Sequence, residues 1–330
     1  MPDELPGKLP NKPTFRYRLA VASPVKKICS GETITVTLPD SDARGPNLQP
    51  LEKTLFEDND TNRGNPLFGP VAIESAALGD TLIVHFQKII PDVRPARTWL
   101  APGHGFASDE LLLGKNDDIS DKPEHMFLWD LQDGFAQMQN PIGEKSLRVP
   151  TAPFLGAVGV ATAAAPSTML AGKHGGNIDH PDLTAGSTLW LPVFAESGLL
   201  YFGDMHAAQG QGETAGGGLE ISGTVTLRVE LLKNKRIHLP RYQTPDGAAA
   251  LGVGKDFKQA AEEALAAMTH WIASEGWNLF DANMFVNQTC ELRPGGLAES
   301  YSVVSCFIPK PALELNDLPL ALPVEQPGRF

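Results

Sequence analysis

The chain contains few thiols for its 330 residues, only Cys29, Cys290 and Cys306. Three widely spaced cysteines cannot form the disulfide framework of a small secreted scaffold, and they do not have the spacing of a zinc ribbon. The sequence also lacks a Gly-x-Ser-x-Gly nucleophile elbow, and no cysteine has a histidine near it along the chain. The sequence therefore favours buried thiols and gives no support to a serine or cysteine nucleophile.

Basic residues are also few, since 27 Lys and Arg stand against 39 Asp and Glu, for a formal net charge of -12. Nucleic-acid binding depends on basic patches, so this balance disfavours nucleic acid and favours a neutral or cationic small substrate. The longest weakly polar run, residues 151–166, is too short to span a bilayer. Residues 1–15 lack the apolar core of a signal peptide. We expect a cytoplasmic protein with no membrane partner.

The overall composition, 42% hydrophobic and 20% charged, is ordinary for a globular protein. The length exceeds the ~100–200 residues of a typical domain, so several lobes are expected. We predict an N-terminal β-rich lobe at 1–150 and a central β-rich lobe at 151–234, which carries the active-site motifs. An α+β lobe at 235–330 follows and ends in a proline-rich tail.

Most of the hydrophobic periodicity is two. Residues 32–38 alternate Ile, Val and Leu with Thr, and the run lies between Gly31 and Pro39. Comparable patterns predict further strands at 81–86, 187–194, 198–202, 224–231 and 301–308. Because 32 glycines and 28 prolines separate these short runs, we predict a mainly β fold with a multi-lobed sandwich or barrel body.

One segment has helical periodicity instead. Apolar residues at 257, 261, 264, 265, 268, 271 and 272 predict an amphipathic helix over 255–274, within a smaller α+β C-terminal lobe. The closing stretch from Pro309 is rich in proline, and we expect it to wrap over a neighbouring surface in extended form. Regions 40–66 and 91–150 show few repeating patterns and read as loop-rich.

Residues 203–213, GDMHAAQGQGE, are the first candidate for chemistry. If 199–205 is a strand, Asp204 and His206 project from one face and can bind one metal ion together. The alternative is a turn aspartate beside a structural histidine. Glu213 follows two glycines that allow the chain to fold back, and burial would raise its pKa to that of a general acid or base.

Residues 172–180, GKHGGNIDH, are the second candidate. The pair Gly175 and Gly176 predicts a loop rather than a regular element. Such a loop is either a simple turn or a place where Asn177, beside backbone N–H groups, stabilises an oxyanion. His174 and Asp179 add two metal-binding side chains.

Five segments, in order and spacing, resemble the acetamidase/formamidase family: residues 65–82, 153–161, 174–179, 186–193 and 203–213. The resemblance covers roughly residues 24–310. It implies a β-rich, multi-lobed fold, hydrolysis of short linear amides such as formamide and acetamide to ammonia and a carboxylate, a bound divalent ion and a homo-oligomer.

The positions that match the family motifs receive the following roles. We assign the metal shell to Asp204 and His206, completed by His174 or Asp179; catalysis to Glu213 and Asn177; and substrate contacts to Gly175, Gly176 and Gln209. A zinc-type ion lowers the pKa of bound water to about 7, which makes a metal-activated water the expected nucleophile.

Two positions depart from the family pattern. Gln211 stands where the usual motif has an aspartate, and Ala22-Ser23 replaces a position that often holds histidine. If the missing aspartate binds metal or tunes the site, we expect a slower enzyme, an altered substrate, or no activity on simple amides. The last case would be a non-catalytic metal or small-molecule binding protein of the same fold. This is the alternative to the amidohydrolase prediction.

Overall fold

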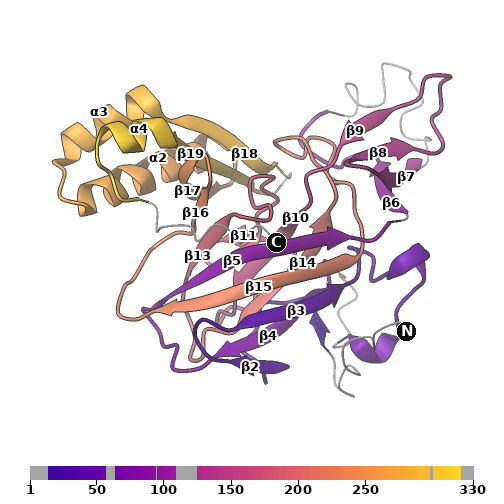
Figure 1. Ribbon diagram of the computed structural model, residues 1–330, viewed down its shortest axis with the longest axis horizontal. Helices are drawn as coiled ribbons and strands as arrows, with labels where there is room; N and C mark the ends of the chain where they lie inside the picture. The colour runs from indigo at the N-terminus through magenta and orange to yellow at the C-terminus, as the bar shows by residue number, and fades with distance from the viewer. Residues whose placement is uncertain (1–13, 57–63, 94, 109–124, 298–299, 321–330) are drawn as a thin grey trace.

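The computed structural model describes residues 14–56, 64–93, 95–108, 125–297 and 300–320. These residues form three β-sheets and three α-helices, with two short 3-10 turns at Pro46–Leu48 and Lys53–Leu55 (Figure 1). The mainly β prediction, with a smaller α+β C-terminal region, is confirmed.

A seven-stranded sheet runs in the order β1-β4-β14-β10-β12-β11, with β2 added in parallel beside β4. Its strands are β1 (Phe15–Arg16), β2 (Lys26–Ile28), β4 (Leu67–Ile73), β10 (Phe154–Val160), β11 (Ala171–Gly172), β12 (Gly175–Asn177) and β14 (Leu200–His206).

An eight-stranded sheet runs in the order β18-β19-β17-β16-β13-β5-β15-β3. Its strands are β3 (Thr33–Leu38), β5 (Thr81–Pro91), β13 (Thr188–Pro192), β15 (Gly223–Leu232), β16 (Arg241–Thr244), β17 (Gly247–Gly254), β18 (Glu291–Leu297) and β19 (Ser302–Pro309). All six strands predicted from alternation are present, with boundaries shifted by a few residues.

The two large sheets form a sandwich. The alternating burial of β3 turns Ile34 inward, where it joins one hydrophobic cluster with Val84 and Leu227 of its own sheet and with Val158 and Phe202 of the other. Packing of two inner faces in this way explains the period of two in the sequence.

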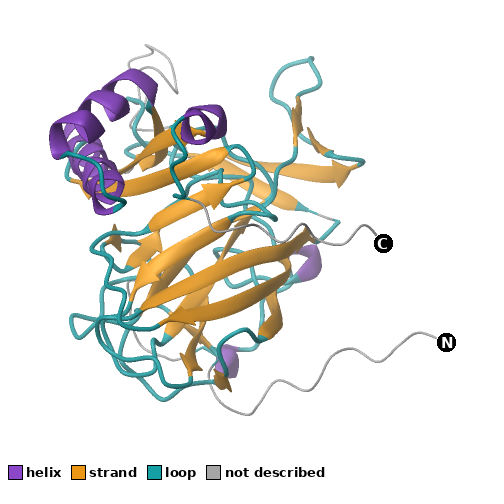
Figure 2. Ribbon diagram, turned by 60° about the vertical axis from the view of Figure 1, so that its left-hand side comes forward, coloured by secondary structure: helices purple, strands orange, loops and turns teal. Residues whose placement is uncertain are grey.

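Helices cover the end of the second sheet, as Figure 2 shows. They are α2 (Phe257–Ser274), α3 (Leu279–Thr289) and α4 (Lys310–Leu315). The Asp256 side chain caps α2 by accepting from the Gln259 N–H at 2.8 Å. Gly252 lets α2 lie against β17, because a Cβ at this position would stand 2.1 Å from the Ala260 carbonyl. The helix prediction for 255–274 is confirmed.

A four-stranded sheet projects from the body (Figure 1). Its strands are β6 (Ala96–Leu100), β7 (His125–Gln132), β8 (Phe135–Met138) and β9 (Arg148–Pro150). Region 91–150 is therefore more regular than predicted. The pattern is weak because these strands bury only a few residues, among them Ala96, Trp129 and Ala136.

Two further local predictions need correction. Gly175 and Gly176 lie in strand β12 rather than in a loop, and their φ values of 82° and 91° are open to glycine but strained for other residues. Residues 310–315 form α4 rather than an extended segment, with Pro at the start of the helix, where its missing N–H costs nothing. Residues 321–330 lie outside the described part of the chain.

The three predicted lobes share their sheets. The seven-stranded sheet joins strands from 1–150 on one side to strands from 151–234 on the other, and the eight-stranded sheet contains strands from all three ranges. None of the described helices combines the length and the apolar character needed to cross a membrane.

Candidate metal and catalytic site

The site lies where β14 ends beside β10. Strand β14 pairs with β10 so that His206 lies opposite Phe154. Asp204 lies two residues before His206 on the same strand. Gly156 of β10 lies beneath two carboxylates. A Cβ there would stand 2.5 Å from Asp179 Oδ1 and 2.6 Å from Asp204 Oδ2, so only glycine leaves room for both.

Asp204, His206 and Glu220 form a compact and buried group whose ligand atoms lie within 4.8 Å of one another. His206 Nε2 is 3.0 Å from Glu220 Oε1 and 3.5 Å from Asp204 Oδ1. Glu220 reaches this place because its backbone pairs with Arg97 of β6 in both directions, at 2.8 and 2.9 Å.

Gln209 orients the His206 ring. Its Nε2 donates to the Asp179 carbonyl at 2.7 Å, so its Oε1 is the atom that faces His206 Nδ1 at 2.7 Å. Nδ1 therefore carries a proton, and in the neutral ring the Nε2 lone pair points toward Glu220 and Asp204. A lone pair facing two carboxylates is stable only with a cation or a proton between them.

Asp179, His206 and Glu213 form a second group that shares the histidine, again with ligand atoms within 4.8 Å. Asp179 and Glu213 have φ values of 46° and 45°, in the left-handed region. Such backbone geometry is uncommon outside glycine and clusters at functional sites. The left-handed backbone turns the side chains of Asp179 and Glu213 toward His206. Neither residue lies on the strand that carries His206.

Several carboxylate oxygens at this point are buried without a hydrogen-bond partner in the described part of the chain: Asp179 Oδ1, Asp204 Oδ1 and Glu220 Oε2. Leaving buried anionic oxygens unpaired is costly, so a cation or protons must compensate them. The nearby buried guanidinium of Arg97 does not, because it pairs with Asp40 and Asp42 at 2.8 and 2.6 Å. The donor set of carboxylates and one imidazole fits a divalent metal ion.

Burial shapes the proton affinities of the site. It raises the pKa of the Glu213 carboxyl to about 8, against the opposing effect of His206, and also raises the pKa of Glu220. Burial, with the charges of Glu213 and Asp204, holds the pKa of Asp179 well above its usual value. Burial disfavours the His206 imidazolium, but Glu220 and Asp204 outweigh this and raise its pKa. Without a metal ion, the site therefore retains protons.

Asn177 supports the carboxylates. Its amide donates to Asp179 Oδ2 at 2.5 Å and to the Tyr301 hydroxyl at 3.0 Å, so both hydrogens are engaged. Its Oδ1 accepts from Asn65, which also donates to Asp204 Oδ2 at 2.7 Å. The predicted oxyanion role of Asn177 conflicts with these bonds, and the geometry favours a role in positioning Asp179.

Some predicted residues are not brought to the centre. His174 belongs to neither group of ligands; burial lowers its pKa to about 4. Gly175 and Gly176 are held inside β12, paired with β10 and β11, and do not line the cavity beside Glu213. Gln211 is exposed, whereas the residues of both ligand groups are buried or half-buried. The position that departs from the family motif therefore lies at the surface.

Residues that sequence reasoning missed come from distant segments. Glu220 lies two residues after three consecutive glycines and belongs to neither of the two polar motifs. Asn65 opens the first family-like block, which was a signal available in the sequence. Tyr301 had none, because its contact with Asn177 depends on how β19 packs.

The C-terminal region completes the site. Gly296 lies so near Asp179 that a Cβ would stand 2.9 Å from Oδ2. The Gly296 N–H donates to the Ile178 carbonyl at 3.1 Å, and the Leu297 N–H donates to the Gly212 carbonyl at 3.1 Å. Strand β18 thus fastens the segments that carry Asp179 and Glu213.

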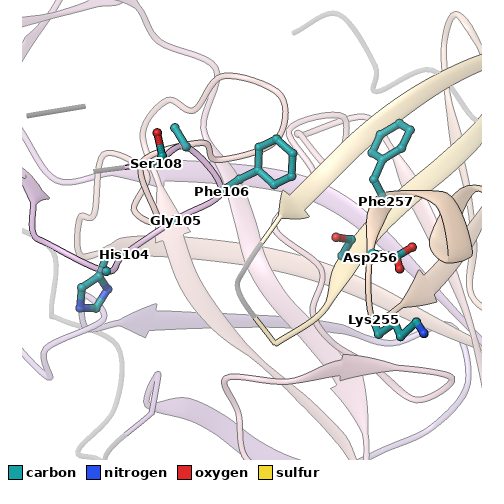
Figure 3. A pocket seen from close by; sticks show the side chains of 10 residues that line it. His104, Gly105, Phe106, Ser108, Lys255, Asp256 and Phe257 are labelled. Atoms are coloured by element: carbon teal, nitrogen blue, oxygen red, sulfur yellow. The ribbon is translucent and has the colours of Figure 1, made fainter. Parts of the chain in front are cut away.

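A cavity of about 420 Å3 opens beside Gln209 and Glu213. A second hollow, of about 470 Å3, lies between the loop at 103–108 and the start of α2, where Figure 3 shows Phe106 and Phe257 on its walls. None of the residues lining the second hollow belongs to either ligand group. The first cavity is therefore the candidate substrate site.

The fold and the centre together define a β-sandwich protein with a buried carboxylate–histidine site. Solved structures match this fold over nearly the whole chain. A predicted acetamidase/formamidase from Thermoanaerobacter tengcongensis matches with a TM-score of 0.78 and 25% identity, over 92% of this chain and 96% of that one. An acetamidase from Bacillus halodurans matches with a TM-score of 0.76 and 26% identity, over 92% and 97%.

The model of the acetamidase/formamidase family matches residues 160–297, which include every residue of both ligand groups. A formamidase from Methylophilus methylotrophus is 44% identical over 62 residues, and an acetamidase from Mycolicibacterium smegmatis is 40% identical over 62. Each match spans 18% of this chain and only 15% of the relative. The resemblance to the acetamidase/formamidase family is confirmed for the segment 160–297 that carries the site.

Proposed function

We propose that the chain is a metal-dependent amidohydrolase that cleaves the carbon–nitrogen bond of small neutral amides to ammonia and a carboxylate. The observation that carries this proposal is the convergence of four carboxylates, Asp179, Asp204, Glu213 and Glu220, on the single imidazole of His206. The names of the relatives supply the reaction class, and the cavity beside Glu213 supplies a place for the substrate.

Asp204, His206 and Glu220 would hold the ion, and Asp179 would be a further ligand. A divalent metal such as zinc would lower the pKa of a bound water to about 7 and polarise the amide carbonyl. The buried, unpaired oxygens of Asp204 and Glu220 support this assignment. Gln209 keeps the proton on Nδ1 of His206, so that the lone pair of Nε2 is available to bind the ion.

Glu213 is the proposed proton carrier. It lines the cavity, and a carboxyl whose pKa is about 8 both accepts and returns a proton near neutral pH. It takes a proton from the attacking water and delivers it to the departing nitrogen, which leaves as ammonia. Asn177 acts by holding Asp179, with which its amide bonds at 2.5 Å.

Glu213→Gln tests the mechanism directly. The substitution keeps the size of the side chain and removes its basicity, so we expect loss of ammonia release with an intact fold and bound metal. Formamide, acetamide, propionamide and urea are supplied with and without a chelator. Full activity after complete metal removal would contradict the metal-dependent mechanism. Full activity of the variant would exclude Glu213 as the base.

We further propose that the protein is cytoplasmic and a homo-oligomer. The three cysteines are free, which suits a reducing compartment, and exposed apolar residues such as Phe280 and Met284 lie on α3. Light scattering on the purified chain tests the second point, since a monomer at all concentrations contradicts it.

A further inference from the structure

The cavity beside Glu213 is larger than the shortest amides require. Its volume of about 420 Å3 falls within the range of ~300–1,000 Å3 that is typical of sites for drug-sized ligands. Acetamide, in contrast, offers a single methyl group to any surface beyond the reacting amide. The walls therefore have room to contact an acyl group of several carbons.

One wall comes from the small sheet. Trp129 of β7 and Val149 and Pro150 of β9 face the cavity, and Trp129 is only 4% exposed. The opposite wall is the segment that carries Glu213, with Leu219 and several glycines. The small sheet thus contributes carbon surface to the same cavity that Glu213 lines.

The charge of the lining is as selective as its shape. Among the described residues that line this cavity, Glu213 is the one ionisable side chain, and no lysine, arginine or histidine is present. A substrate with its own carboxylate would lose water there without gaining a cationic side chain from the lining. Neutral amides are therefore favoured over acidic ones.

We infer that the preferred substrate is a neutral primary amide whose acyl group is apolar and larger than the methyl of acetamide, with the acyl chain against Trp129 and Val149. The inference rests on the proposed amide hydrolysis and specifies its substrate class. Hexanamide and phenylacetamide represent this class, and succinamate represents the excluded acidic amides.

The test is the ratio kcat/KM for acetamide, butyramide, hexanamide, phenylacetamide and succinamate, measured as ammonia release with metal supplied. Each methylene buried against the wall is expected to raise kcat/KM about fourfold. Succinamate is expected to react more slowly than butyramide despite the similar chain length.

Val149→Asn makes the wall polar, and we expect the ratio of hexanamide to acetamide kcat/KM to fall about tenfold, on the scale of one to two lost methylene contacts. Val21→Asn is the matched control, because Val21 is 59% exposed and does not line the cavity, and it should leave the ratio unchanged.

The outcomes separate the two claims. Ammonia from acetamide with equal or falling kcat/KM along the series overturns the inference and leaves the amidohydrolase proposal standing. Succinamate as the best substrate also overturns it. No ammonia from any amide, with metal bound, overturns the amidohydrolase proposal and the inference with it. The series uses the unmodified chain, so its result holds even if Val149→Asn fails to fold.

Discussion

The contacts of His206 set the orientation of its imidazole ring. Nδ1 donates to Gln209, and Nε2 faces the carboxylates of Glu220 and Asp204. An imidazole held between an amide on one side and two acids on the other is oriented for the metal binding proposed above. Glu220 is therefore as central to the site as the two residues of the Asp-x-His motif.

Glu220→Gln is predicted to weaken metal binding by about tenfold or more, because the neutral amide keeps the shape of the side chain but removes a ligand charge. Metal content after dialysis, together with circular dichroism to verify the fold, provides the measurement. Glu196→Gln, at an exposed position, is the control and should bind metal normally. Unchanged affinity in Glu220→Gln would remove Glu220 from the metal shell.

The pH dependence of stability should reveal the same residues in metal-free protein. The folded-state pKa of Glu213 is raised to about 8, and those of Asp179, Glu220 and His206 are also raised. A raised folded-state pKa contributes stability below the unfolded-state pKa, and this is lost as pH rises through the folded-state value. We expect the chelated protein to have a lower melting temperature at pH 9 than at pH 5.

Glu213→Gln should flatten this profile between pH 6 and 9, because the variant has no carboxyl to lose its proton there. Differential scanning calorimetry at several pH values measures both proteins. A chelated protein that becomes more stable as pH rises over this range would contradict the buried, proton-retaining site.

At the scale of elements, strand β10 supports the site because Gly156 has no side chain. Gly156 leaves the space in which Asp179 and Asp204 approach each other, and a methyl group there would overlap both carboxylates. The buried strands on either side, β12 and β14, leave little room for β10 to shift.

Gly156→Ala is accordingly predicted to reduce metal content and amide turnover by tenfold or more, an estimate on the order of the effect of misplacing reacting groups by about 1 Å. Gly143→Ala is the matched control, since a Cβ there would meet nothing within 4 Å. Normal activity in Gly156→Ala, with the substitution verified and the fold intact, would show that the carboxylates need not lie this close.

Sequence patterns predicted elements best where one face is buried over many residues. The Thr-rich alternation of β3 and the apolar stripe of α2 were both found, because each packs along its whole length. The short strands β6 to β9 and the glycine strand β12 were not, since their hydrogen bonds come from neighbours that no local pattern identifies.

At the scale of the whole molecule, the metal would join segments that are far apart in the sequence. Asp204 and His206 come from β14, Asp179 follows β12, and Glu213 and Glu220 lie in the long connection before β15. The Gly295–Leu297 end of β18 contacts two of these segments. An ion bound across them stabilises the folded state alone.

Metal removal should therefore lower the melting temperature of the whole chain. An ion present at 100 times its dissociation constant contributes about 2.7 kcal/mol, which corresponds to several degrees. Thermal unfolding is followed before chelation, after chelation and after return of zinc or another divalent ion, and the transition should shift down and then recover. A transition that none of these steps moves would argue against an ion at this centre.

The sequence by itself determined the β-rich architecture, the amphipathic helix and the two polar motifs, because alternation, helical spacing and local composition are properties of consecutive residues. It also selected Asp179, Asp204, His206, Gln209 and Glu213, which the structure brings together. Only the tertiary structure added Glu220 and left His174 and Gln211 outside. Those decisions depend on strand register and on left-handed turns at Asp179 and Glu213, which join segments that no local pattern relates.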